Sequence, residues 1–302
     1  MAPVGSQPSL ASRRRGSEAV GRPRVGRGPV PVALLLVLCL PVFAAKLSFT
    51  EGPLAGINEL FDGVPAVSVA PTPVVCVICT RHPDTIREAL REPPGEGYIA
   101  YLHKVEGHAE RMTGLECLLV HYTQLEGDGL GGRGVKALLI AAMDKRISDE
   151  YHARLFSMIR ATDAPTLGLC GGCQLMARAY GGKVGTMREL QEGETDPNPA
   201  YHPGFLKQWG FTPVRIVKRD PIFEGLGDEI VVDERHYQEI KVLPDEFEVL
   251  ATHDVCRIQA IKHKTKLMYG TQFHPENYTT EHPAGEAILR SFFGLAGLGP
   301  KG

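Results

Sequence analysis

Residues 164–185 read Ala-Pro-Thr-Leu-Gly-Leu-Cys-Gly-Gly-Cys-Gln-Leu-Met-Ala-Arg-Ala-Tyr-Gly-Gly-Lys-Val-Gly and carry the clearest structural pattern in the chain. The apolar run 166–169 reaches Cys170, passes two glycines and enters an apolar-periodic segment that stops at Gly181 and Gly182. The pattern predicts a strand, a tight turn and a helix. Such a turn lifts one side chain clear of the sheet edge, and the helix N-terminus lowers a thiol's pKa and offers N–H groups to an anion. Cys170 is therefore a candidate nucleophile.

The surrounding chain predicts an α/β domain with a mainly parallel sheet flanked by helices. Continuous β-branched and apolar runs are typical of buried parallel strands, and helical patterns alternate with them. The expected strands of this first half are 74–79, 115–122, 135–142 and 166–169, with helices at 83–91 and 148–159. Functional sites in such sheets lie at the carboxyl ends of the strands, where Cys170 falls.

The C-terminal half adds shorter strands to this pattern. Residues 188–210 are polar and contain three prolines, which predicts a loop on the active-site side, with Trp209 packing inside it. The strands expected after this loop are 212–217, 230–232, 247–252, 257–261 and 267–273, followed by a helix at 283–293.

Composition divides the 302 residues into three parts. Residues 1–45 hold a basic region, an apolar run at 31–43 and then small residues, which is typical of a signal peptide cut after Ala44 or Ala45. The apolar run is shorter than the ~20 residues of a transmembrane helix, which favours cleavage over an N-terminal anchor. Residues 46–73 predict a linker or extended arm, and residues 74–296 form the α/β domain.

This leader predicts an exported protein, periplasmic or extracellular, or one anchored to a membrane by an uncleaved leader. A start codon placed too far upstream would instead leave a cytoplasmic protein. Six of the 33 basic residues and one of the 35 acidic residues lie in the leader, so the remaining body carries a net charge of about −7. An acidic body gives no electrostatic reason to expect nucleic acid or an anionic membrane as a partner.

The expected chemistry is acyl transfer by a cysteine. This chemistry needs a thiolate, a base, a carboxylate that orients the base, and donors for the oxyanion. His274 and Glu276 lie two residues apart just past the last short strand, and so on one side of an extended segment. They are the candidate base and orienting carboxylate, although the sequence alone does not show that they meet Cys170.

At these residues the chain resembles the class I glutamine amidotransferases. Residues 168–174, Gly-Leu-Cys-Gly-Gly-Cys-Gln, match the G-x-C-x-G-x-Q elbow of that family, and residues 270–276, Gly-Thr-Gln-Phe-His-Pro-Glu, match its second block. The resemblance covers residues 74–295 and implies a flavodoxin-like α/β fold. It also implies five roles: Cys170 as nucleophile, His274 as base, Glu276 as orienting residue, Gln174 as a contact for bound glutamine, and the N–H of Gly171 as an oxyanion donor.

A third segment bears on the branch of the family. Residues 235–244 resemble the H-x-Q segment that lies near the substrate pocket in γ-glutamyl hydrolases, which adds His236 and Gln238 as substrate-binding candidates. Residues 247–252 resemble both that branch and the amidotransferase part of guanylate synthetases. The motifs therefore identify the family without choosing a branch.

One loop departs from the family pattern. After the third strand the family has a Gly-Gly-Pro loop whose backbone supplies the other oxyanion donor, whereas this chain reads Ile140-Ala-Ala-Met-Asp144. A backbone with positive φ at Ala142 or Met143 would be strained, because only glycine adopts it freely. We expect these two residues to form the oxyanion loop, and a weakened oxyanion hole with reduced activity or an altered substrate is the alternative.

The cysteines allow two other interpretations. Cys170-x-x-Cys173 at a helix start also describes a redox pair, but redox chemistry does not need the block at 270–276. A zinc site that adds Cys76 and Cys79 is disfavoured, because strand alternation sends these two side chains to opposite faces. We expect two buried core thiols there, and neither a metal nor a cofactor.

The predicted reaction is attack of Cys170 on a γ-glutamyl amide, giving a thioester that water resolves. With glutamine as substrate, the products are glutamate and ammonia. The alternatives are an exported γ-glutamyl hydrolase or peptidase, and a binding protein that has lost catalysis. No segment resembles a nucleotide-binding P-loop or a synthetase domain, so biosynthetic use of ammonia requires a separate synthetase chain. The sequence does not predict the oligomeric state.

Overall fold

The computed structural model describes residues 60–62, 73–93, 95–125, 130, 134–142 and 149–299, all within one unit that spans residues 42–302. The predicted leader, most of the predicted arm, Met143 and Ser148 lie outside the described residues. What the sequence predicts for them stays a prediction.

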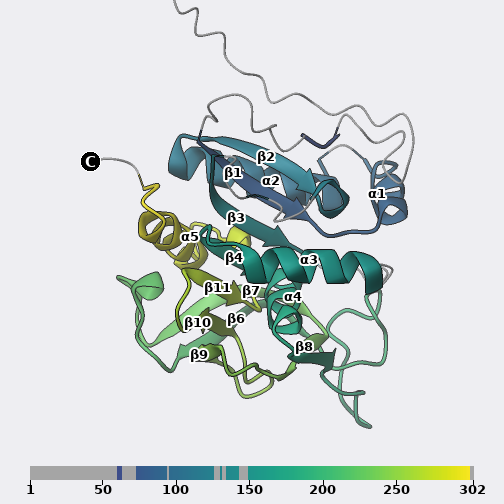
Figure 1. Ribbon diagram of the computed structural model, residues 1–302. Helices are drawn as coiled ribbons and strands as arrows, with labels where there is room; N and C mark the ends of the chain where they lie inside the picture. The colour runs from purple at the N-terminus through teal and green to yellow at the C-terminus, as the bar shows by residue number, and fades with distance from the viewer. Residues whose placement is uncertain are drawn as a thin grey trace, which may run out of the picture. The chain divides into compact units, whose positions relative to one another are not determined.

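A nine-stranded sheet forms the centre of the domain (Figure 1), in the order β2-β1-β3-β4-β11-β10-β9-β6-β7. Five neighbouring strands are parallel: β1 (Val74–Cys79), β2 (Glu116–His121), β3 (Val135–Ala141), β4 (Thr166–Leu169) and β11 (Met268–Thr271). Four more continue the sheet in antiparallel pairs: β6 (Gln208–Ile216), β7 (Glu229–His236), β9 (Phe247–Thr252) and β10 (Ala260–His263). This arrangement confirms the predicted α/β fold with short strands added in the C-terminal half.

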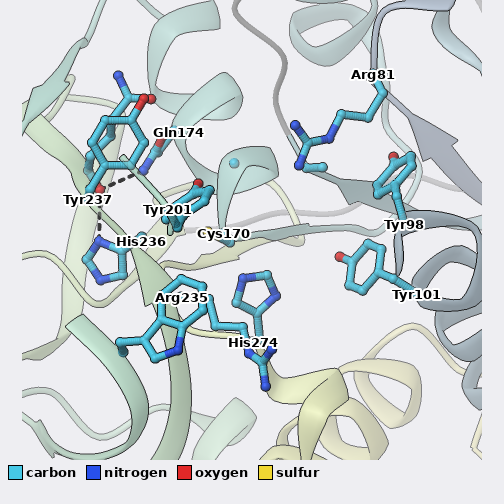
Figure 2. A pocket seen from close by; sticks show the side chains of 14 residues that line it. Arg81, Tyr98, Tyr101, Cys170, Gln174, Tyr201, Arg235, His236, Tyr237 and His274 are labelled. Atoms are coloured by element: carbon cyan, nitrogen blue, oxygen red, sulfur yellow. Dashed lines mark hydrogen bonds between the residues drawn. The ribbon is translucent and has the colours of Figure 1, made fainter. Parts of the chain in front are cut away.

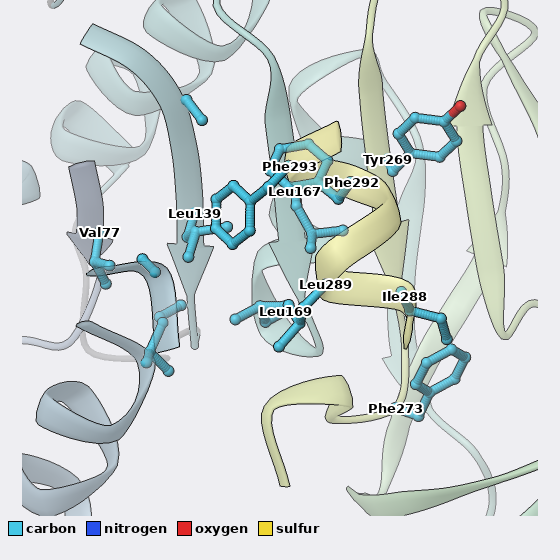
Figure 3. Packing of buried hydrophobic residues seen from close by; sticks show 14 of the residues in the cluster. Val77, Leu139, Leu167, Leu169, Tyr269, Phe273, Ile288, Leu289, Phe292 and Phe293 are labelled. Atoms are coloured by element: carbon cyan, nitrogen blue, oxygen red, sulfur yellow. The ribbon is translucent and has the colours of Figure 1, made fainter. Parts of the chain in front are cut away.

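Alternate residues of each buried strand point to opposite faces of the sheet, and both sets are apolar. Helices therefore cover both faces. The core on one face includes residues of α1 (Pro83–Ala89), α2 (Gly97–Thr113) and α5 (Ala284–Leu295). The core on the other face includes residues of α3 (Asp149–Ala161) and α4 (Gly171–Ala179). Figure 3 shows the first core, where Phe292 and Phe293 of α5 lie among Leu139, Leu167 and Leu169 of the strands. No helix in the described part of the chain is long and apolar enough to cross a membrane.

The cysteines of β1 follow the predicted alternation. Cys76 packs in the core with α3 and α4, whereas Cys79 packs in the core with α2 and α5. Both are fully buried, and burial raises the pKa of Cys76 to about 12. The described cysteines are free thiols, and no group of three or more His, Cys, Asp or Glu among the described residues could hold a metal ion.

Three features differ from the sequence-based expectations. Helix α2 was not predicted, and its buried positions Leu102, Val105, Ala109 and Met112 are spaced three or four apart among polar and tyrosine residues that dilute the apolar signal. Strand β6 begins at Gln208, so Trp209 lies in a strand and not in the predicted loop, which ends earlier. A small two-stranded sheet, β5 (Lys183–Thr186) with β8 (Gln238–Val242), was also not predicted.

Part of the predicted arm is packed onto the domain. Phe61 is fully buried in the core with α2 and α5, and its ring centroid lies 5.1 Å from that of His121. The next residue, Asp62, pairs with β2: its backbone N–H donates to the carbonyl oxygen of Leu119, and its carboxylate accepts from the Leu119 N–H. Residues 60–62 therefore attach this segment to the outer parallel strand.

Replacing Phe61 by alanine should lower the free energy of unfolding by about 3–5 kcal/mol, because the change removes a fully buried ring and leaves a cavity. The control is Leu90→Ala, since Leu90 is 46% exposed and its truncation should change stability by less than about 0.5 kcal/mol. Urea denaturation of the two variants makes the comparison, and equal stability would contradict the packing of this segment onto the domain.

Candidate active site

Three neighbouring strands end at the same level of the sheet. The parallel register pairs Leu169 of β4 with Ala141 of β3 on one side and with Thr271 of β11 on the other. The residues that follow these strands therefore leave the sheet together at its carboxyl edge. Ala142, Cys170 and the segment after β11 meet at this edge, although they are far apart in the sequence.

Cys170 occupies the turn between β4 and α4 in a conformation that residues with a side chain rarely adopt. Its φ is 49° and its ψ is −103°, and its N–H donates to the carbonyl oxygen of Thr271 at 2.7 Å. The turn needs glycine beside it, because a Cβ on Gly172 would lie 1.9 Å from the carbonyl oxygen of Ile140. The structure thus has the predicted elbow. Cys170 gives α4 no side-chain cap, which leaves the N–H of Gly171 available to an oxyanion.

His274 and the buried Glu276 form a pair next to this thiol, and Figure 2 shows the His274 ring beside Cys170. The Nδ1 atom of His274 donates to Oε1 of Glu276 at 2.6 Å, and the ring also interacts with Cys170. Burial alone would lower the pKa of His274, but the charges of Glu276 and Cys170 outweigh it and raise that pKa well above the ordinary value. Burial would likewise raise the pKa of Glu276, yet His274 lowers it overall. The pair is therefore an imidazolium and a carboxylate when Cys170 is a thiolate.

Helix α2 and strand β7 hold the turn that carries this pair, η4 (Pro275–Asn277). The N–H of His274 donates to the carbonyl oxygen of Asp233 at 2.8 Å. On the other side, Nε2 of His108 lies 3.0 Å from the carbonyl oxygen of Glu276. Because Arg111 can only donate to Nδ1 of His108, at 2.7 Å, the proton of a neutral His108 is on Nε2 and points at that carbonyl.

Tyr101 of α2 covers the same pair from the pocket side. Its ring stands edge-on to the His274 ring, with 6.1 Å between the centroids. Burial and the nearby Glu276 carboxylate raise the pKa of Tyr101, so its hydroxyl stays protonated beside Glu276. The sequence did not single out Tyr101, because the helix that carries it, α2, was itself not predicted.

The predicted substrate contacts form one connected group. Gln174 gives the two hydrogens of its side-chain nitrogen to the carbonyl oxygen of Gln238 and to Oε1 of Gln272, both at 3.0 Å. The Nδ1 atom of His236 lies 2.9 Å from the same Gln238 oxygen, and its Nε2 lies 3.0 Å from a carboxylate oxygen of the buried Glu234. His236 is thus held in the pocket wall through Nδ1, whereas its Nε2 makes no hydrogen bond to the described residues, and Gln174 and Gln238 lie beside it.

Gln272 joins this group to the thiol and was not singled out from the sequence. Its side-chain nitrogen lies 3.5 Å from Sγ of Cys170, while its oxygen accepts from Gln174. It is fully buried. Its place two residues before His274, inside the second motif, was the signal that could have identified it.

A cavity of about 220 Å³ lies over Cys170. This volume is below the roughly 300–1,000 Å³ of pockets for drug-sized ligands and suits a small substrate. Its wall brings together all the predicted site residues that the structure describes except Glu276, which is buried beneath His274. Tyrosines, Trp209 and two arginines that were not predicted complete the wall, and Figure 2 shows Tyr98 and Tyr201 on opposite sides of Cys170. These residues come from the end of β1, from α2, from the loop before β6, from β6 itself and from the end of β7. Only Arg235 and Tyr237 lie in a segment that a sequence motif had singled out.

Ala142 lies in the loop after β3, where this chain lacks the glycines of the family pattern. Its φ is 67°, which is the strained backbone conformation that the sequence predicts there. The hydroxyl of Thr80 lies 2.6 Å from the carbonyl oxygen of Ala142 and 3.1 Å from that of Ala141, and holds the turn in place. Ala142 lines the pocket beside Gly171. Met143, the other predicted residue of the oxyanion loop, lies outside the described residues.

Comparison with known proteins agrees with this geometry. A family model described as glutamine amidotransferase class-I matches residues 144–295, half of the chain. The chain is 40% identical over 135 residues to a glutamine-hydrolysing GMP synthase subunit of Pyrococcus abyssi, and 37% identical over 135 residues to the same subunit of Methanothermobacter thermautotrophicus. Each match covers 45% of this chain and 62% of the relative, so the chain spans about three fifths of the length of these curated relatives.

Solved structures support the fold. A protein from Thermoplasma acidophilum, described as a GMP synthase subunit, superposes with a TM-score of 0.53 at 24% identity, covering 75% of this chain and 94% of that one. A glutamine amidotransferase from Thermotoga maritima superposes with a TM-score of 0.51 at 14% identity, covering 74% and 97%. At these identities the likeness concerns the fold alone.

Replacing Ala142 by glycine should leave the protein at least as stable as the wild type. Glycine relieves about 1–2 kcal/mol of left-handed strain, which offsets its larger loss of conformational freedom of about 0.5–1 kcal/mol. The matched control is Ala141→Gly, which places glycine in a strand, removes a buried methyl group and should be destabilising by about 1 kcal/mol or more. Denaturant unfolding compares the two, and an equal loss would contradict the strain at Ala142.

The His274 ring should titrate above the ordinary value of about 6.5 in the wild type, and at a lower pH in Glu276→Gln. The sign follows from the charges: Glu276 favours the protonated ring, and without it burial favours the neutral one. NMR titration of the histidine rings measures both midpoints. His121 is the internal control, because burial lowers its pKa to about 4 in a part of the fold that the substitution does not change. A His274 midpoint that is the same in both proteins would contradict the pairing.

Proposed function

The chain belongs to the class I glutamine amidotransferase family, and on that premise we propose that it hydrolyses the side-chain amide of glutamine through a thioester at Cys170. The observation that carries this proposal is the common end of β3, β4 and β11, which places Cys170 beside the buried His274–Glu276 pair. A thiol alone in a pocket does not indicate catalysis. A thiol on a strained turn, next to a histidine that a carboxylate orients, is the arrangement typical of a cysteine nucleophile.

In the first half of the proposed reaction, the Cys170 thiolate attacks the γ-carbonyl carbon. The oxygen becomes an oxyanion, which the N–H of Gly171 stabilises at the first turn of α4. The protonated His274 then gives its proton to the departing nitrogen, the C–N bond breaks, and ammonia leaves a γ-glutamyl thioester on sulfur.

In the second half, water attacks the thioester. His274, now neutral, takes a proton from the water, the C–S bond breaks, and glutamate leaves while the thiolate and the imidazolium are restored. Glu276 keeps Nδ1 of His274 protonated throughout, so that Nε2 is the atom that exchanges protons with the reacting groups.

Ammonia released in this way would serve biosynthesis only with an acceptor. The matched relatives are named as one subunit of a glutamine-hydrolysing GMP synthase. We propose that a separate synthetase chain supplies the acceptor here as well, because the relatives that this chain resembles are named as a single subunit of the synthase.

Glutamate release from glutamine tests the proposal. Wild-type protein should release glutamate, and Cys170→Ala should lower the rate by roughly 10³-fold or more, because no other group replaces the nucleophile. The matched control is Cys173→Ala: Cys173 is fully buried in α4, and the loss of its sulfur removes no reacting group. Folding of each variant is checked by circular dichroism. Equal rates for wild type and Cys170→Ala, or a folded wild type that releases no glutamate, would refute the proposal and favour a binding role.

A further inference from the structure

The pocket over Cys170 carries an unbalanced positive charge. Its described wall includes Arg81 and Arg235 and no carboxylate, although the body of the chain is acidic. Arg235 is balanced, because its Nε donates to Asp233 at 2.7 Å. Arg81 forms no ion pair with any carboxylate of the described residues, and its buried Nε has no hydrogen-bond partner among them. A buried donor on a permanent cation is costly unless a ligand accepts from it.

The backbone around Arg81 is held firmly. Nε2 of His121 lies 2.9 Å from the carbonyl oxygen of Arg81, and the residue before it, Thr80, binds the Ala142 turn. The residue after it, His82, caps the start of α1 through its side chain. The guanidinium lies 5.0 Å from the centre of the Tyr98 ring. These contacts fix the position of the Arg81 backbone, and the Tyr98 ring is the neighbour of its guanidinium.

Arg81 and Gln174 lie on opposite sides of the thiol. In Figure 2 the guanidinium of Arg81 points into the pocket from the side of Tyr98, whereas Gln174 and His236 lie beyond Cys170. The family resemblance implies that the glutamyl part of the substrate contacts Gln174. A glutamyl part held on that side of Cys170 would direct the departing nitrogen toward the side where Arg81 lies.

We propose that Arg81 forms a leaving-group subsite for a carboxylate, so that the pocket also takes γ-glutamyl amides of amines that carry a carboxylate, such as γ-glutamyl amino acids. This inference rests on the proposed function and extends it to a second substrate class. Ammonia is too small to reach such a subsite. A carboxylate is planar and can accept two parallel hydrogen bonds from a guanidinium, which a neutral amide cannot match.

The chemistry is that of the glutamine reaction with a different leaving group. The Cys170 thiolate forms the thioester, the C–N bond breaks, and His274 gives its proton to the amino group of the departing amino acid. Water then releases glutamate and restores the thiolate. Arg81 contacts only the carboxylate of the leaving amino acid. It therefore determines which leaving groups the pocket prefers and takes no part in bond breaking.

The test compares two substrates that differ only in the charge of the leaving group. Full-length protein is incubated with γ-glutamylglycine or with γ-glutamylglycinamide, and glutamate release gives kcat/KM for each. The wild type should prefer γ-glutamylglycine by roughly tenfold or more, as expected for a charge-assisted, two-bond contact. Glutamine is the third substrate and reports the proposed function independently.

Three variants assign the preference to Arg81. Arg81→Gln should remove it, and Arg81→Lys, which keeps the charge but not the fork, should keep only part of it. The matched control is Arg87→Gln on the adjacent helix α1, where Arg87 pairs with Asp84 on the surface. This variant should keep the full preference.

Each other outcome overturns the subsite. Equal kcat/KM for the two γ-glutamyl compounds in the wild type, with glutamine still hydrolysed, refutes the subsite alone. An equal loss on all three substrates in Arg81→Gln would assign Arg81 to the thiol or to the glutamyl part. If the wild type releases no glutamate from any of the three, the proposed function fails and the subsite fails with it.

Discussion

The register of three parallel strands brings the residues of the site together. Because β4 pairs with both β3 and β11 and all three stop at one level, Ala142, Cys170 and His274 meet at one edge. Close packing of α4 against the sheet maintains this arrangement. A Cβ on Gly270 would lie 2.7 Å from Sγ of Cys173, so the glycine of β11 makes room for α4. The buried thiol of Cys173 thus has a packing role beside Cys170, the proposed nucleophile.

Buried contacts hold His274, the proposed base, in place. Glu276 is almost fully buried, and its charge is compensated by His274, while α2 contacts the same turn through His108 and Tyr101. Removing one partner of a buried ion pair typically costs about 3–5 kcal/mol, because the other charge is left uncompensated. The ion pair with Glu276 therefore holds the His274 ring in one orientation with Nδ1 protonated. Proton transfer to and from a reacting group requires such a fixed ring.

Much of the fold and part of the site could be predicted from the sequence. Continuous apolar runs identified the parallel strands, and the glycines around Cys170 identified the elbow, because both are local signals. Helix α2 was missed, since histidine and tyrosine occupy positions in its apolar pattern. Arg81 and Thr80 could not be assigned either. Their roles arise only when β1 lies next to β3, and nothing local distinguishes them from surface residues.

In the proposed reaction Cys170 carries the acyl group during turnover. Protein mixed with glutamine and quenched in acid within the steady state should carry a γ-glutamyl adduct, and fragmentation of the peptide that contains both Cys170 and Cys173 can locate it by mass spectrometry. The account predicts a γ-glutamyl group on Cys170, with none on Cys173. Glutamate release without any adduct on Cys170, or with the adduct on Cys173, would contradict it.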